Sequence, residues 1–193
     1  MKSLLIALDV MHGKDQDIHN PVLWAFLVSL AKQGSLAVIL GGPPRRSVSR
    51  LPFRRPGPRP LRDRHEHRFG LPHLSAGEQR LADHDAALVL KQVGLCHMAE
   101  EARRDLEVAR DPTGFLLESP ADPVSMAAES QVPSFWTWPE LRGLEMEENM
   151  AMVTFDQGAM GHKKRKPTTI TTNLPNMTDL RNLHAKNPLS ILY

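Results

Sequence analysis

The chain has 193 residues, of which 41% are hydrophobic, and this is enough for one globular domain with a sizeable core. No apolar stretch approaches the ~20 residues that cross a bilayer, and the first residues lack the cleavage site of a signal peptide, so we expect an intracellular protein with no membrane partner. The single cysteine, Cys96, excludes an internal disulfide and a thiolate zinc cluster, and the net charge of +2 excludes little by itself.

The first 40 residues predict a strand, a helix and a second strand. Residues 3–10, SLLIALDV, form a short apolar run that ends near Asp9. Asn20 and Pro21 are typical of a helix start, and the apolar spacing that follows continues to Gly34. Residues 35–40, SLAVIL, predict another buried strand. This order indicates a βαβ unit with parallel strands.

A long loop with a strong positive charge follows at residues 42–74. It is rich in proline and glycine, and its arginines outnumber its acids by nine to two between residues 45 and 68. A second basic run, KKRK, stands at residues 163–166. This uneven distribution predicts a polyanion as the partner.

The remaining elements predict the fold class. Ser75 and Glu78 make a capping box before a long helix that ends near residue 106. Further strands are expected at 113–119, 149–156 and 167–174, with a last helix at 177–184. We therefore expect a single α/β domain over residues 1–193, Rossmann-like, with a mainly parallel sheet that is incomplete at the N-terminus and with strands and a helix at 155–193.

Three predicted strands end in residues that could carry chemistry. They end at Asp9, at the Gly41-Gly42-Pro43-Pro44 sequence (GGPP) and at Glu118, and ligands of open α/β sheets bind beyond the carboxyl ends of strands. Each ending also has a structural interpretation. Asp9 could cap a turn, GGPP could only terminate a strand, and Glu118 could be a solvated strand end.

Taken together, these endings resemble the cytosine-specific DNA methyltransferase family. The family has a Gly-Gly-Pro-Pro-Cys sequence and, further along, a Glu-Asn pair, and this chain has GGPP followed by Glu118-Ser119. Residues 155–173, FDQGAMGHKKRKPTTITTN, are similar to the Lys-Pro-Thr and Thr-Asn segment of its shorter members. The sequences PGPRPLR, FGLPHLS and FWTWPEL between these motifs are similar to methylase-related domains of mobile-element polyproteins.

The resemblance implies a chemistry that this chain lacks the means to perform. In the family, a cysteine thiolate attacks a flipped cytosine, a glutamate contacts the base, and S-adenosylmethionine gives the methyl group. Arg45 occupies the position of the nucleophile here, while Glu118 matches the glutamate. Cys96 falls inside the predicted long helix and is expected to be a core residue. We therefore predict an inactive methyltransferase-like domain.

The resemblance also implies an incomplete cofactor site. The family begins with a strand and a glycine-rich turn, and this chain starts after that point. Asp9, Gly42, Pro43 and Pro44 are the positions that the resemblance assigns to S-adenosylmethionine. We expect this chain to bind the cofactor only weakly, with a dissociation constant above about 1 mM.

DNA is the partner that the resemblance and the charge both predict. If four to six cations contact phosphates, log affinity should fall with log salt at a slope of roughly −4 to −5. The basic residues that we expect to face phosphates are Arg46, Arg50, Arg54, Arg55, Arg59, Arg62, Lys163, Lys164, Arg165 and Lys166.

Two alternatives to a DNA-binding pseudoenzyme stay open. KKRK fits a nuclear localisation pattern, so the chain could be a basic interaction module. It could also be a fragment of a mobile-element polyprotein without a function of its own. The histidines at 65, 67 and 73 lack the spacing of a metal site, so no metal is expected.

Overall fold

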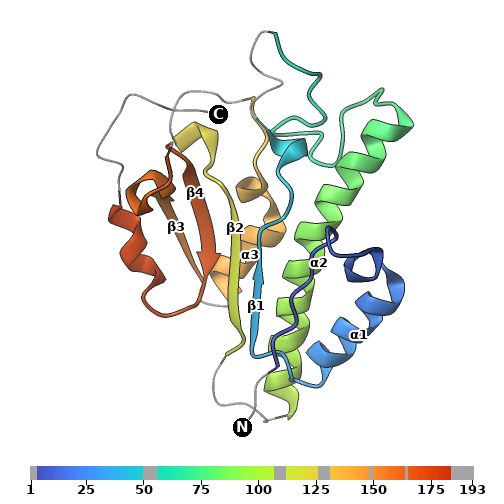
Figure 1. The fold of residues 1–193 in the computed structure, drawn as a ribbon, viewed down its shortest axis with the longest axis vertical. Helices are drawn as coiled ribbons and strands as arrows, with labels where there is room; N and C mark the ends of the chain where they lie inside the picture. The colour runs from blue at the N-terminus through green and yellow to red at the C-terminus, as the bar shows by residue number, and fades with distance from the viewer. Residues whose placement is uncertain are drawn as a thin grey trace. The chain divides into compact units, whose positions relative to one another are not determined.

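The fold is described from a computed structural model, which covers residues 4–49, 56–106, 112–125, 131–147, 150–163 and 165–183 (Figure 1). The chain divides into two compact units. The first comprises Met1–Ala37 and Gly94–Thr113, and the second comprises Val38–Val93 and Gly114–Tyr193. Among the described residues, no helix is long and apolar enough to span a membrane.

The first unit contains α1 (Pro21–Lys32) and the second half of α2 (Ala76–Leu106). Helix α1 begins as the sequence predicts, because the Asn20 side chain accepts a hydrogen bond from the backbone N–H of Val22 at 2.9 Å and Pro21 occupies the first turn. The buried hydrophobic side chains of this unit are small or aliphatic: Leu27, Ala31, Leu95, Cys96, Ala99 and Ala102. The prediction that Cys96 is a core residue of the long helix is confirmed.

The predicted strand at residues 3–10 is wrong for the described residues 4–10. They contain no strand, and Leu4 and Leu5 are 85% and 86% exposed. An apolar run of this length predicts burial only if another element covers it, and sequence periodicity does not test for that. The βαβ unit expected in the first 40 residues is therefore absent from the described chain.

The second unit is built on a four-stranded sheet with the strand order β1-β2-β4-β3. Its strands are β1 (Val38–Gly41), β2 (Gly114–Pro120), β3 (Ala151–Asp156) and β4 (Pro167–Thr172). The strands fall where the sequence predicts them, and the α/β class is confirmed.

The prediction of a mainly parallel sheet is wrong. Only β1 and β2 run parallel, whereas β4 runs antiparallel to both β2 and β3. The connection between β3 and β4, residues 157–166, is short and begins with the 3-10 helix Gln157–Met160, and so short a link joins antiparallel neighbours. A parallel return would need a crossover of a dozen or more residues, usually through a helix.

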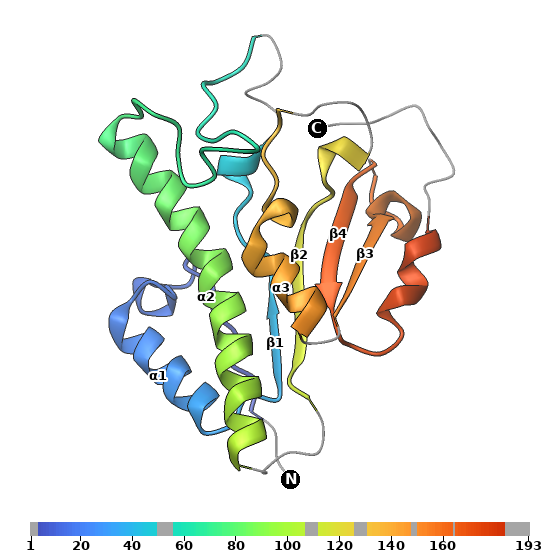
Figure 2. The same cartoon turned by 180° about the vertical axis from the view of Figure 1, so that it is seen from behind.

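Helices cover the sheet of the second unit on one face. Figure 2 shows α3 (Pro139–Glu147) and the first half of α2 on the same side of the sheet. Phe115 and Leu117 of β2 are fully buried, and so are Leu141 and Leu144 of α3. Elsewhere Val153, Phe155 and Ile170 form a cluster with Met177 and Leu180. Those last two residues belong to the 3-10 helix Met177–Asn182, which replaces the predicted final helix; residue 184 lies outside the described chain.

The capping box also forms as the sequence predicts. The Ser75 backbone N–H and hydroxyl both donate to Glu78 Oε2, at 2.8 and 2.7 Å, and Glu78 N–H donates to Ser75 Oγ at 3.3 Å. Trp136 and Trp138 are buried, and Trp136 Nε1 donates to the Pro120 carbonyl at 2.7 Å.

Candidate functional site at the ends of β1 and β2

The GGPP loop and Glu118 meet at one edge of the sheet. Strands β1 and β2 are parallel neighbours, so their carboxyl ends lie together, and Gly41 pairs with Leu117. A Cβ atom at Gly42 would lie 3.3 Å from Glu118 Oε2. A Cβ atom at Gly41 would lie 2.3 Å from the side-chain oxygen of Gln92 on α2. Both glycines therefore allow the loop to approach its neighbours closely.

Glu118 faces a lysine from the neighbouring strand end. Lys166 Nζ lies 3.8 Å from Glu118 Oε1, and both side chains are about one third exposed, at 29% and 32%. Glu118 Oε1 is itself buried and accepts no hydrogen bond from the described residues. The site therefore holds a carboxylate with unused acceptor capacity next to a cation and a glycine loop.

Arg45 lies exposed at the end of the GGPP loop. The next residues form a short 3-10 helix, Arg46–Val48. This helix is fastened to α2 by Asp85, whose carboxylate accepts a hydrogen bond from the Ser47 backbone N–H at 3.0 Å and from Arg46 Nη2 at 3.4 Å. Although it is bonded to Asp85, the Arg46 side chain remains 60% exposed.

Arg62 anchors the second part of the long loop, residues 56–74, which we call the strap. Its side chain is buried, with the residue 1% exposed, and its guanidinium donates to the carbonyls of Arg68 and Ala82. The guanidinium carbon also lies 5.4 Å from the centre of the Trp138 ring and 6.0 Å from that of Phe135. Arg62 is thus held inside the protein and is not accessible to a DNA phosphate in this structure.

Two further arginines pair the strap with the rest of the second unit. Arg64 makes a two-pronged ion pair with Asp122, at 2.7 and 2.6 Å, and Arg68 makes another with Glu140, at 2.8 and 3.1 Å. Burial alone would raise the pKa of Asp122, but hydrogen bonds from Arg64 and from a backbone N–H outweigh it and lower the pKa. These two ion pairs therefore hold the strap against the rest of the second unit.

His65 and His67 of the strap take part in a local turn. Asp63 accepts hydrogen bonds from the backbone N–H groups of His65 and His67, at 3.0 and 2.8 Å, and its Oδ2 lies 2.6 Å from His67 Nδ1. Burial opposes ionisation of Asp63, yet the hydrogen bonds from His67 and His65 lower its pKa. The contact between Asp63 and His67 therefore stabilises a turn of the strap.

Asp156 shapes the turn that carries the KKRK sequence. Its carboxylate accepts hydrogen bonds from Arg165 Nε at 2.7 Å and from the backbone N–H groups of Gly158 and Lys166, both at 2.9 Å. Burial would raise the pKa of Asp156, but these hydrogen bonds prevail and lower it. Two members of the basic run, Arg165 and Lys166, therefore face protein carboxylates.

The remaining candidates for DNA contact divide into three groups. Lys163 is exposed. Arg59 donates to the Pro72 carbonyl at 3.5 Å and thereby helps to close the strap. The other four lie outside the described residues: Arg50, Arg54, Arg55 and Lys164.

The residues assigned to the cofactor belong to different units, so their assignment stays a prediction. Asp9 belongs to the first unit, where its side chain accepts a hydrogen bond from the Met11 N–H at 2.9 Å. Gly42, Pro43 and Pro44 belong to the second unit. The observed role of Asp9 is that of a turn cap.

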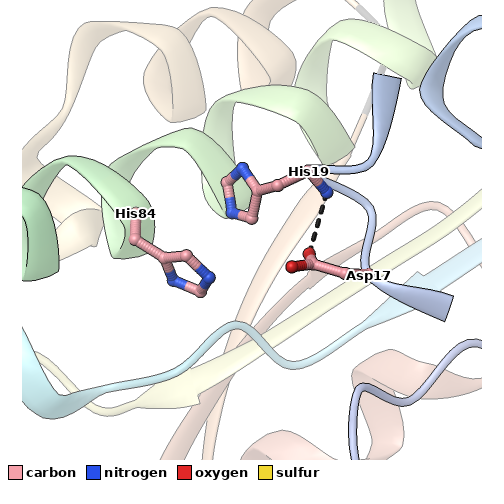
Figure 3. A group of neighbouring side chains, drawn as sticks. All are labelled: Asp17, His19 and His84. Carbon is pink, nitrogen blue, oxygen red and sulfur yellow. Dashed lines mark hydrogen bonds between the residues drawn. The ribbon is translucent and has the colours of Figure 1, made fainter. Parts of the chain in front are cut away.

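Figure 3 draws Asp17, His19 and His84, which offer the kinds of atom that bind zinc. Asp17 accepts a hydrogen bond from the His19 backbone N–H at 2.9 Å, within the first unit. His84 lies on α2 in the second unit. Because the group draws residues from both units, we infer no metal site from it.

Sequence reasoning missed the residues that hold this site in place, namely Asp85, Gln92 and Asp156. A signal was available for the first two. They stand seven residues apart, so they occupy the same face of α2 as the buried Ala82, Val89 and Cys96. Polar side chains on the buried stripe of a helix usually bond to a neighbouring element.

Comparison of the chain with protein-family profiles, with curated proteins and with solved structures finds no match.

Proposed function

We propose that this chain is a degenerate domain of the cytosine-specific DNA methyltransferase type, which binds DNA without methylating it. The observation that supports the proposal is the close approach of the GGPP loop to Glu118, with Gly42 lying against the carboxylate. The two motifs that resemble the family are far apart in sequence and adjacent in space.

The missing nucleophile accounts for the expected lack of activity. Arg45 follows the second proline, and a guanidinium does not add to carbon 6 of cytosine and leave again as a thiolate does. The one thiol of the chain, Cys96, is fully buried in α2. Purified protein should transfer no labelled methyl group from S-adenosylmethionine to a cytosine-containing duplex, and transfer above a protein-free control would contradict the proposal.

The basic side chains that remain accessible carry the DNA-binding part of the proposal. Arg45, Arg46, Arg59 and Lys163 are exposed, and all four belong to the second unit. Guanidinium and ammonium groups neutralise phosphates and release counterions, which makes binding dependent on salt. Binding of this kind should depend little on sequence, because phosphate contacts carry no base information.

The decisive experiment measures the salt dependence of binding to a labelled duplex by fluorescence anisotropy. The variant Arg45→Ala/Lys163→Ala should bind more weakly, and its slope of log affinity against log salt should be shallower by about two units. The matched control is Lys14→Ala/Lys32→Ala, which removes two exposed cations of the first unit and should leave the slope nearly unchanged. Equal effects of the two variants, or no binding by the wild type, would refute the proposal.

A further inference from the structure

Helix α2 places a buried carboxylate behind the GGPP loop. The Asp85 side chain is 0% exposed, and its two oxygens accept hydrogen bonds from the Ser47 backbone N–H and from Arg46. His84 Nδ1 also lies 3.7 Å from Asp85 Oδ1. Burying a carboxylate is costly unless hydrogen bonds and opposite charges compensate for it, and the loop donates two such hydrogen bonds to Asp85.

The strap is held to the same helix by Arg62, whose guanidinium donates to the Ala82 carbonyl. Burial lowers the pKa of Arg62 to about 10, and the negative charges of Asp85 and Asp83 oppose that shift. Asp83 is exposed, whereas Asp85 is buried, so Asp85 is the counter-charge inside the protein. Asp85 therefore bonds directly to the loop after GGPP and acts on Arg62 of the strap only through its charge.

We propose that Asp85 is a positioning residue, which fixes the 45–48 loop to α2 and so holds Arg45 and Arg46 in one conformation. Its relevance to DNA rests on the function proposed above, but its effect on the loop does not. Asp85 contacts no DNA in this proposal and acts only through the loop that it holds.

Hydrogen exchange of the Ser47 amide tests the proposal directly. This amide donates to Asp85, so NMR should show it protected in the wild type and at least tenfold less protected in Asp85→Ala. The matched control is Asp83→Ala, which removes an exposed carboxylate two residues away on the same helix and should leave Ser47 protection unchanged. If Asp85→Ala does not fold, Asp85→Asn keeps the side-chain size and should still reduce the protection.

The DNA-binding readout separates this inference from the proposed function. Asp85→Ala should bind the duplex several-fold more weakly than Asp83→Ala, although each variant loses one negative charge and the two have the same net charge. If Ser47 protection falls while the wild type binds no DNA, the proposed function fails and the role of Asp85 stands. Unchanged Ser47 protection in a folded Asp85 variant would overturn the inference.

Discussion

At the scale of single residues, several arginines of this chain stabilise the fold, although their clustering in the sequence predicts contacts with phosphates. A run of arginines between residues 45 and 68 is typical of a phosphate-binding loop. Instead Arg62 is buried against the rings of Phe135 and Trp138. Arg64 and Arg68 form two-pronged ion pairs. A planar guanidinium with five N–H donors suits both uses, so composition alone does not distinguish them.

The hydrogen bonds of Asp156 predict how the free energy of unfolding depends on pH. Its pKa is lowered in the folded protein, so its carboxylate stabilises the fold above the unfolded pKa of about 4, and this contribution is lost as the pH falls through the lower native pKa. Asp156→Asn should reduce the free energy of unfolding by about 2 kcal/mol at pH 7, because a charged acceptor of three hydrogen bonds is lost.

Urea unfolding of the wild type and of Asp156→Asn, at pH 7 and at pH 3, measures this effect. The difference between the two proteins should shrink at pH 3. Asp179→Asn is a suitable control, since Asp179 is exposed in the 3-10 helix Met177–Asn182 and should give a small difference at both pH values. A difference for Asp156→Asn that does not change with pH would contradict the prediction.

At the scale of elements, local signals predict local structure well. The start of α1, the capping box and the full length of α2 follow from residues within a few positions of each other. The direction of β4 and the fate of residues 3–10 depend on partners distant in sequence, and the strand patterns contain no information about them.

The candidate site also has features that the sequence predicts and features that depend on partners distant in sequence. The rule that ligands bind beyond the carboxyl ends of strands identified both the GGPP loop and Glu118 as candidates, and the structure brings the two together. The rule did not indicate that Lys166 would face Glu118, because that contact requires β4 to lie antiparallel beside β2. Nor did it reveal Asp85 or Gln92, which lie on another element.

The contact between β1 and α2 makes an element-scale prediction. A methyl group at Gly41 would displace the Gln92 side chain, whose amide donates to the Leu116 carbonyl at 2.9 Å. Gly41→Ala should therefore destabilise the fold by about 1–2 kcal/mol, mainly through the loss of this hydrogen bond. The measurement is the urea midpoint for Gly41→Ala, for Gln92→Ala and for the double variant.

The double variant identifies the cause. Once Gln92 is shortened, the added methyl group no longer meets it, so the two costs should not add. Gly143→Ala is a useful control, because a Cβ atom there would meet nothing within 4 Å, and alanine is the better helix former in α3. Fully additive costs for Gly41→Ala and Gln92→Ala would contradict the proposed displacement.

At the scale of the whole molecule, the two units differ in the size of the side chains they bury. The second unit buries Phe115, Phe135, Trp136, Trp138 and Phe155. Within the described residues of the first unit, the buried hydrophobic side chains include no aromatic one. Aromatic side chains bury the largest apolar areas, so the second unit has the larger hydrophobic stabilisation.

This difference predicts unequal local stability, with the first unit opening more readily. In hydrogen-exchange mass spectrometry, peptides from α1 should exchange faster than peptides from β2 and β4. Leu27→Ala removes the buried leucine of α1 and should speed exchange in that helix by at least tenfold, while β2 and β4 change little. Leu117→Ala, the matched truncation in β2, should instead speed exchange throughout the sheet. Equal protection of α1 and the sheet, with both variants affecting all peptides alike, would mean that the chain opens as one cooperative unit.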